Sequence, residues 1–171
     1  MRLQILLVVL GLLSLGSSCQ GSGDDLGLVR VDRPLPALAG RTVQGAEISP
    51  SDYAGHVTVV NFWATWCGPC RQEQPALQQV WSKYRDRGVE FVGVDYRDDA
   101  AAAAAWIDEF GVTYPSVADP PGGWADDFAL RGAPTTFVAD AAGRIRFLIT
   151  GAASPDELSS VLDELLAAPS S

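Results

Sequence analysis

The stretch VTVVNFWATWCGPC, residues 57–70, decides the fold. Its first part, residues 57–62, is rich in β-branched side chains and almost continuously apolar, which is the pattern of a strand buried on both faces. The strand runs directly into CGPC, residues 67–70, and proline is favoured in the first turn of a helix. We therefore expect the two cysteines to lie where a buried strand ends and a helix begins.

Such a junction favours redox chemistry at the cysteine pair. The first turn of a helix presents unpaired N–H groups and the positive end of the helix dipole, and both stabilise a thiolate. We predict that Cys67, at an exposed tip, is the nucleophile and that Cys70, one turn into the helix, closes a disulfide on it. Half of a zinc site and a purely structural disulfide are weaker alternatives. A closed zinc site takes four Cys or His ligands, and only His56 is available to join the pair.

Outward from the motif, the apolar and polar segments predict an α/β fold. The expected elements are a hairpin within 35–48, strands at 57–62, 89–94, 135–139 and 144–149, and helices from the motif to about 87, at 100–110, at 124–130 and from 155 onward. The early β-α-β order implies a parallel strand pair, and the late β-β order implies an antiparallel one. We expect a central mixed β-sheet with helices on both faces and an N-terminal hairpin extension.

Two segments resemble a known family. NFWATWCGPCRQEQP, residues 61–75, is similar to the active-site segment of the thioredoxin superfamily and, more narrowly, of its extracytoplasmic, membrane-anchored TlpA/ResA-like branch. GAPTTF, residues 132–137, followed by Asp140 and Gly143, resembles the second signature of that branch. The resemblance covers roughly residues 35–166 and implies a thioredoxin-like fold, thiol–disulfide oxidoreductase activity, and no bound cofactor or metal.

The resemblance also implies roles for residues near the pair. Pro134 would be a cis-proline that faces the cysteines, and the backbone of Ala133 would pair with an extended substrate chain. An ordinary proline at the start of a strand is the alternative. Trp66 is a candidate substrate contact, and two further aromatic side chains, Trp63 and Trp124, are candidates to line the same surface, although aromatic residues in such places are as often packing.

The proton acceptor is expected at Glu73. Ordinary thioredoxins carry a buried Asp in the strand before the motif, but the matching position here is Asn61, which cannot titrate. In the TlpA/ResA-like branch a Glu three residues after the second cysteine supplies the acid, and Glu73 matches it. Partial burial would raise its pKa toward that of a useful proton acceptor for Cys70. A solvated glutamate on the helix surface is the alternative. The predicted catalytic set is thus Cys67, Cys70, Glu73 and Pro134.

The N-terminus is predicted to direct export. Residues 1–18 combine a basic start, an apolar run and small residues, as in a secretory signal peptide, and the run is shorter than the roughly 20 residues of a spanning helix. Residues 19–34 are expected to be a flexible tether, and residues 35–168 the thioredoxin-like domain.

Cys19 resembles the lipid-modified cysteine of bacterial lipoproteins, although Gly16 stands where that signal usually has Leu. We expect lipid attachment at Cys19, ahead of ordinary cleavage nearby or an uncleaved anchor. The protein would then lie at the outer face of the cytoplasmic membrane or in the periplasm.

Composition narrows the partners. The chain has 171 residues, enough for one domain with a modest surplus, and a net charge of −9 argues against a nucleic-acid partner. We expect a monomer that meets a protein substrate with a disulfide or dithiol, is anchored to a membrane by its N-terminus, and is served by a membrane electron donor of the thiol-relay type.

The expected function is the reduction of protein disulfides. Gly-Pro between the cysteines matches thioredoxin, a reductant at about −270 mV, whereas the oxidant DsbA lies near −120 mV. In the resembled branch this role often serves cytochrome c maturation, with apocytochrome c as substrate. A general periplasmic or cell-surface disulfide reductase or oxidase is equally compatible. A peroxiredoxin-like peroxidase fits less well, because residues 61–67 lack the required Pro, and a binding or chaperone module would not need both cysteines.

Overall fold

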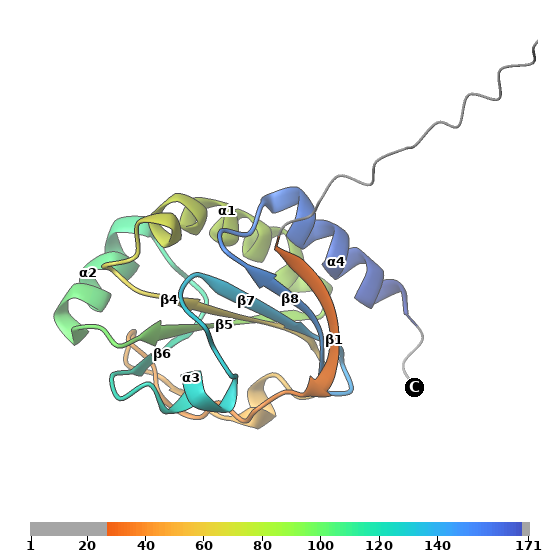
Figure 1. Cartoon of the computed structure of the whole chain (residues 1–171), viewed down its shortest axis with the longest axis horizontal. Coiled ribbons are helices and arrows are strands. Elements are labelled where there is room, and N and C mark those ends of the chain that lie inside the picture. Colours follow the sequence, from red (N-terminus) through yellow and green to blue (C-terminus); the bar gives the residue numbers. More distant parts are fainter. Residues whose placement is uncertain (1–26, 169–171) are drawn as a thin grey trace, which may run out of the picture.

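The computed structural model describes residues 27–168. Its centre is a six-stranded sheet in the order β1-β8-β7-β4-β5-β6 (Figure 1). The strands β2 and β3 form a separate two-stranded sheet. In chain order the elements are β1 (Leu28–Pro34), β2 (Gly40–Arg41), β3 (Glu47–Ile48), the 3-10 turn η1 (Pro50–Asp52), β4 (Val57–Trp63), α1 (Gly68–Tyr84), the 3-10 turn η2 (Arg85–Arg87), β5 (Val89–Tyr96), α2 (Ala100–Phe110), β6 (Ser116–Asp119), α3 (Gly123–Asp127), β7 (Thr135–Ala139), β8 (Arg144–Thr150) and α4 (Pro155–Ala167).

Strand β4 lies in the middle of the sheet and carries the motif at its end. Every residue of β4 is buried, as its apolar run predicts. It pairs in parallel with β5, to which α1 provides the crossover, and antiparallel with β7. The mixed sheet predicted from the order of the elements is confirmed.

Helices cover both faces of the sheet, as expected (Figure 1). On one face α1, α2 and α4 enclose a core, and there the Trp63 ring stacks on Trp106 with centroids 5.2 Å apart. On the other face α3 and the β2–β3 hairpin enclose a second core around Phe62 and Phe137. Side chains alternate between the two cores along β4, because successive residues of a strand point to opposite faces. Trp63 is therefore a core residue and does not line the surface around the cysteines.

The prediction of a flexible tether over residues 19–34 is wrong for its last seven residues. Leu28–Pro34 form β1, which pairs antiparallel with β8 at the edge of the sheet. Its charged side chains are typical of a linker, but in the structure they form ion pairs with the rest of the domain. Arg30 pairs with Glu164 at 2.7 Å, and Asp32 pairs with Arg144 at 2.6 Å. Charges on an edge strand also hinder pairing with other chains. The folded domain thus begins before residue 35.

Three smaller features differ from expectation: one strand was not predicted and two helices end at other residues. β6 was not predicted, because only four residues pair with the end of β5 and they include Ser and Ala. α1 ends at Tyr84, and the turn Arg85–Arg87 continues to Gly88, whose left-handed φ of 82° ends the helical segment. α3 is shorter than the predicted segment 124–130. The hairpin expected within 35–48 is confirmed, with strands of two residues each.

The predicted signal peptide, Cys19 and the first part of the tether lie outside the described residues. From residue 27 to residue 168, no helix combines the length and the apolar character needed to cross a membrane.

Candidate active site

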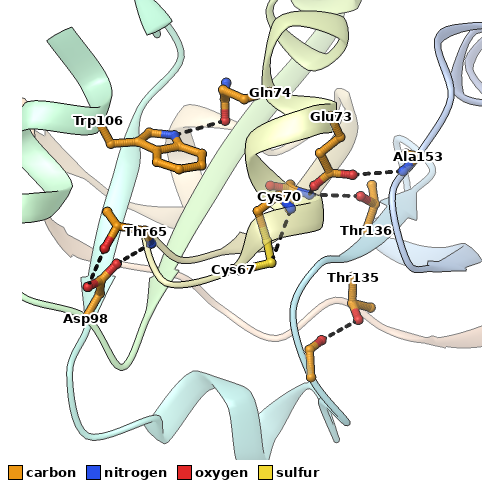
Figure 2. Close-up of a disulfide and its surroundings, with 12 residues drawn as sticks. Thr65, Cys67, Cys70, Glu73, Gln74, Asp98, Trp106, Thr135, Thr136 and Ala153 are labelled. Atoms are coloured by element: carbon orange, nitrogen blue, oxygen red, sulfur yellow. Dashed lines mark hydrogen bonds between the residues drawn. A yellow bond between two sulfur atoms is a disulfide. The ribbon is translucent and has the colours of Figure 1, made fainter. Parts of the chain in front are cut away.

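The cysteine pair lies at the predicted junction of strand and helix. β4 ends at Trp63, and Cys67 is the N-cap of α1, so the positive end of the helix is directed at its sulfur. Cys67 and Cys70 form a disulfide, and the Cys70 N–H donates to Cys67 Sγ at 3.2 Å (Figure 2). The sequence thus places the pair correctly.

The expectation that Cys67 lies at an exposed tip is wrong in its detail. Cys67 is 4% exposed and Cys70 is 1% exposed, although Gly68 and Pro69 between them are exposed. As the N-cap, Cys67 turns its sulfur toward the first turn of α1 and away from solvent. Of the two sulfur-bearing residues, Cys67 remains the more accessible.

The segment before β7 has the geometry that the resemblance implies for Pro134. The Ala133–Pro134 peptide bond is cis. Ala133 packs against the core cluster that contains both cysteines, and its backbone forms no hydrogen bond with any other described residue. The Pro134 carbonyl accepts from Gly151 N–H at 3.0 Å, and the Thr135 hydroxyl donates to the carbonyl of Gly132 at 2.7 Å. These contacts hold the loop while leaving the Ala133 backbone groups free.

Glu73 lies one turn after Cys70 on α1 and is buried, not solvated. Its side chain is 3% exposed. Glu73 Oε2 accepts from the Ala153 N–H at 2.8 Å (Figure 2). Its Oε1 accepts from Asn61 Nδ2 at 3.0 Å. Burial raises the pKa of Glu73 to about 7, although both hydrogen bonds oppose the rise by favouring the carboxylate. A carboxyl with this pKa exchanges its proton near neutral pH.

Asn61 is suited to both protonation states of Glu73. Besides its bond to Glu73, Nδ2 lies 3.0 Å from Thr136 Oγ1, while Oδ1 is buried and has no partner among the described residues. A half-turn of the amide would direct Oδ1 at Glu73 and let it accept the carboxylic proton. Asn61 therefore cannot titrate, but it can follow the titration of its neighbour.

The loop before Cys67 is held by two contacts that the sequence did not predict. Both the N–H and the hydroxyl of Thr65 donate to the Asp98 carboxylate, the hydroxyl at 2.9 Å (Figure 2). Trp66 Nε1 donates to the carbonyl of Arg97 at 3.2 Å, while the Trp66 side chain is 57% exposed. One feature of the sequence could have indicated this contact: the acidic residues Asp98 and Asp99 follow β5. Because β4 and β5 are parallel, their carboxyl ends meet at one edge of the sheet, which brings these residues to the loop after β4.

The aromatic candidates for the surface differ from one another. Trp66 is exposed beside the motif. Trp124 is half-buried in an open hollow at the end of β6, which also includes Asp119 and Asp127. Between residues 27 and 168, no group of three or more His, Cys, Asp or Glu side chains is arranged to hold a metal ion.

Comparisons with known proteins identify related thiol–disulfide proteins. Residues 31–148 match the AhpC/TSA family. The chain is 36% identical over 138 residues to the thiol:disulfide interchange protein DsbE of Pseudomonas fluorescens biotype C, covering 80% of this chain and 70% of that protein. It is 32% identical over 123 residues to the thiol-disulfide oxidoreductase ResA of Oceanobacillus iheyensis, covering 72% of this chain and 64% of that protein.

Solved structures with the same fold are also known. A thioredoxin-family thiol:disulfide interchange protein from Chlorobium tepidum TLS superposes with a TM-score of 0.72 at 31% identity, covering 81% of this chain and 99% of that one. A secreted thiol-disulfide isomerase from Corynebacterium glutamicum superposes with a TM-score of 0.77 at 26% identity, covering 86% and 96%. The predicted thioredoxin-like fold is confirmed.

Proposed function

Because the chain belongs to the AhpC/TSA family and is a thiol–disulfide oxidoreductase, we propose that it is an exported, membrane-tethered reductase of protein disulfides. The observation that carries this proposal is the buried Glu73 carboxyl one helical turn from Cys70. A reductase that resolves its own mixed disulfide needs a group that accepts the proton of the second thiol at neutral pH, and Glu73 has the matching pKa of about 7.

The cycle begins with the reduced pair. The Cys67 thiolate attacks one sulfur of a substrate disulfide, a new S–S bond forms, and the other substrate sulfur leaves as a thiolate. The position of Cys67 at the N-cap supports this role, because the N–H groups of the first turn stabilise its negative charge.

Cys70 then resolves the mixed disulfide. Its thiol gives up a proton to the Glu73 carboxylate and attacks Cys67 Sγ, so that the substrate leaves as a second thiolate and the Cys67–Cys70 disulfide forms. The substrate has gained two electrons and the pair has lost two. A dithiol donor in the membrane returns these electrons, and no bound cofactor takes part.

Substrate alignment is assigned to the segment before β7. The Ala133 backbone groups have no partner within the described residues, so an extended chain can pair with them beside the cysteines. Pro134, which has no N–H, keeps a competing donor away from the disulfide. The exposed ring of Trp66 offers an apolar contact on the same rim.

The N-terminal segment supports the proposed location. A signal peptide at residues 1–18 and a lipid on Cys19 would place the domain outside the cytoplasm on a short tether. The narrower substrate that we propose is apocytochrome c, whose haem-attachment cysteines must stay reduced, and a general reductase of exported proteins is the alternative.

The test is disulfide reduction with matched variants. With a small dithiol as electron source, the wild-type protein should reduce the disulfides of insulin, while Cys67→Ser should be inactive. Cys70→Ser should accumulate mixed disulfides whose partners can be identified, and recovery of apocytochromes would support the narrower role. Wild-type inactivity, undiminished activity of Cys67→Ser, or faster consumption of peroxide than of disulfide would refute the proposal.

A further inference from the structure

A second buried acid lies near the motif and has no role in the cycle above. Asp95 is 1% exposed and lies near the end of β5, opposite Trp63 of β4 in the sheet register. Its Oδ1 is buried and has no partner among the described residues. The pKa of Asp95 is raised to about 7, mainly by burial and secondly by the neighbouring carboxylates, of which Asp98 has the largest effect.

The carboxyl groups of Asp95 and Asp98, three residues apart, lie within hydrogen-bonding reach of each other. A hydrogen bond within this pair exists only while one of the two groups keeps a proton. Asp98 is the ionised member. Although partial burial opposes ionisation, donation from Thr65 and from the Asp99 N–H, at 2.8 Å, lowers the pKa of Asp98. Asp95 is therefore the neutral member and the donor.

The ionised member holds the loop that carries the nucleophile. Asp98 accepts from both the N–H and the hydroxyl of Thr65, two residues before Cys67 (Figure 2). The same loop is closed by the Cys67 N–H, which donates to the carbonyl of Ala64 at 3.1 Å. Any movement of Asp98 is thus passed to Cys67 through a few backbone bonds.

We propose that Asp95 is a positioning residue for the nucleophile: as a neutral acid it donates to the Asp98 carboxylate, and this fixes the Thr65–Cys67 loop. The inference rests on the proposed role of Cys67 as nucleophile. It adds a residue that acts through Asp98 and Thr65 and touches neither substrate nor sulfur.

The surroundings explain why the proton matters. The titratable groups that face Asp95 are Asp98 and Asp99 from the segment before α2 and Asp119 from β6, and all three are acidic. Trp63 and Thr65, from β4 and the loop after it, are neutral. No cation among the residues described is placed to balance a second negative charge. Ionisation of Asp95 would therefore set two carboxylates against each other and weaken the hold of Asp98 on Thr65.

Backbone amides provide separate reporters for the two buried acids. The Thr65 N–H donates to Asp98 and so reports on the Asp95–Asp98 pair, whereas the Ala153 N–H donates directly to Glu73. In the ¹⁵N-labelled, oxidised full chain, in which no cysteine of the pair titrates, both amides should shift with midpoints near pH 7.

Two variants separate these reporters. Asp95→Asn, whose side-chain amide donates at every pH, should abolish the pH-dependent shift of the Thr65 amide signal, here called the Thr65 step. It should leave the corresponding shift of Ala153, the Ala153 step, unchanged. Glu73→Gln should do the reverse. The inference is overturned if the Thr65 step survives Asp95→Asn, disappears with Glu73→Gln, or is absent from the wild-type protein. None of these results depends on whether the protein reduces disulfides, so the proposed function can fail independently.

A rate measurement tests the positioning itself. Alkylation of Cys67 should be measured in the reduced proteins below pH 6, where Asp95 is protonated. Asp95→Ala, which lacks the donor, should react about tenfold more slowly than the wild-type protein, the factor for one lost hydrogen bond of about 1.4 kcal/mol. Asp95→Asn should restore most of the rate. Equal rates for Asp95→Ala and the wild-type protein would contradict the inference, as would a failure of Asp95→Asn to rescue despite a native amide spectrum.

Discussion

Glu73 and Asp95 are two buried acids with the same pKa of about 7 but different partners. Glu73 is met by donors only, the Asn61 amide and the Ala153 N–H. Asp95 is met by another carboxylate, Asp98. A site made of donors accepts the carboxylate form and can therefore take up and release a proton during each turnover. A site made of a second carboxylate requires the proton to stay.

The two acids also differ in what they adjoin. Glu73 lies one turn from the resolving Cys70, whereas Asp95 connects through Asp98 and Thr65 to the loop before Cys67. In the proposed cycle, Glu73 thus serves the resolution by Cys70 and Asp95 the attack by Cys67. An equal pKa does not imply an equal role, because the hydrogen-bond partners decide which protonation state is functional.

The largest effect is expected from removal of the Glu73 proton acceptor. Glu73→Gln should slow the release of substrate from the mixed disulfide by about a hundredfold at neutral pH, because general base catalysis contributes about 10²–10⁴-fold. The fold should survive, since the Asn61 amide can turn its Oδ1 toward the new NH₂ group. Single-turnover release of a labelled substrate measures the rate. Asp95→Asn is the matched control, and an equal loss in both variants would end the distinction between the acids.

The next effect concerns stability, where the two acids should behave alike. The folded state raises the pKa of Glu73 from 4.5 and of Asp95 from 3.8 to about 7, so it binds protons more tightly than the unfolded chain. The free energy of unfolding should therefore fall as pH rises from about 4 to about 7 and be level above that. Between pH 4 and pH 8, the titration of each acid should lower the free energy of unfolding of the wild-type protein by about 3 kcal/mol. Glu73→Gln and Asp95→Asn, which do not titrate, should each lack one of these two losses. Urea denaturation at the two pH values measures this, and a wild-type protein that gains stability over that range would contradict it.

Local pattern made the cysteine pair and the main strands predictable. Each depends on a feature within one segment, either the apolar run of β4 or the Gly-Pro turn at the start of α1. The role of Glu73 came from the family resemblance, since helix α1 alone does not show which of its polar residues faces the sheet.

The features that the sequence did not reveal depend on partners far along the chain. β1 has the composition of a linker and becomes a strand only because β8 lies beside it, with Leu28 opposite Ile149. Likewise Asp98 reads as part of a polar loop until Thr65, 33 residues earlier, is found to donate to it. Pairings of this kind leave no periodicity in the sequence.

The third prediction concerns a variant in which Glu73 faces a second carboxyl group, as Asp95 does. Asn61→Asp would place a carboxyl against Glu73 in place of a donor, and two adjacent carboxyls hold one proton between them. The midpoint of the Ala153 amide titration, and of the pH dependence of substrate release, should rise by about one pH unit or more. Asn61→Gln, which keeps the amide, is a control for the change in shape. An unchanged midpoint would mean that the amide of Asn61 does not set the proton affinity of Glu73.

The smallest effect is expected from Thr65, whose hydroxyl donates to the Asp98 member of the Asp95–Asp98 pair. Thr65→Val keeps the backbone N–H that donates to Asp98 but removes the hydroxyl bond, which is worth about 0.5–1 kcal/mol. The attack of Cys67 on a disulfide should slow by about two- to fivefold, and Thr65→Ser, which restores the hydroxyl, should recover it. The Ala153 titration should not change in either variant, because Glu73 accepts its hydrogen bonds from Asn61 and Ala153 and not from this loop. A shift at Ala153 would show that the two acids are coupled through the sheet, and the division of the cycle between them would then have to be abandoned.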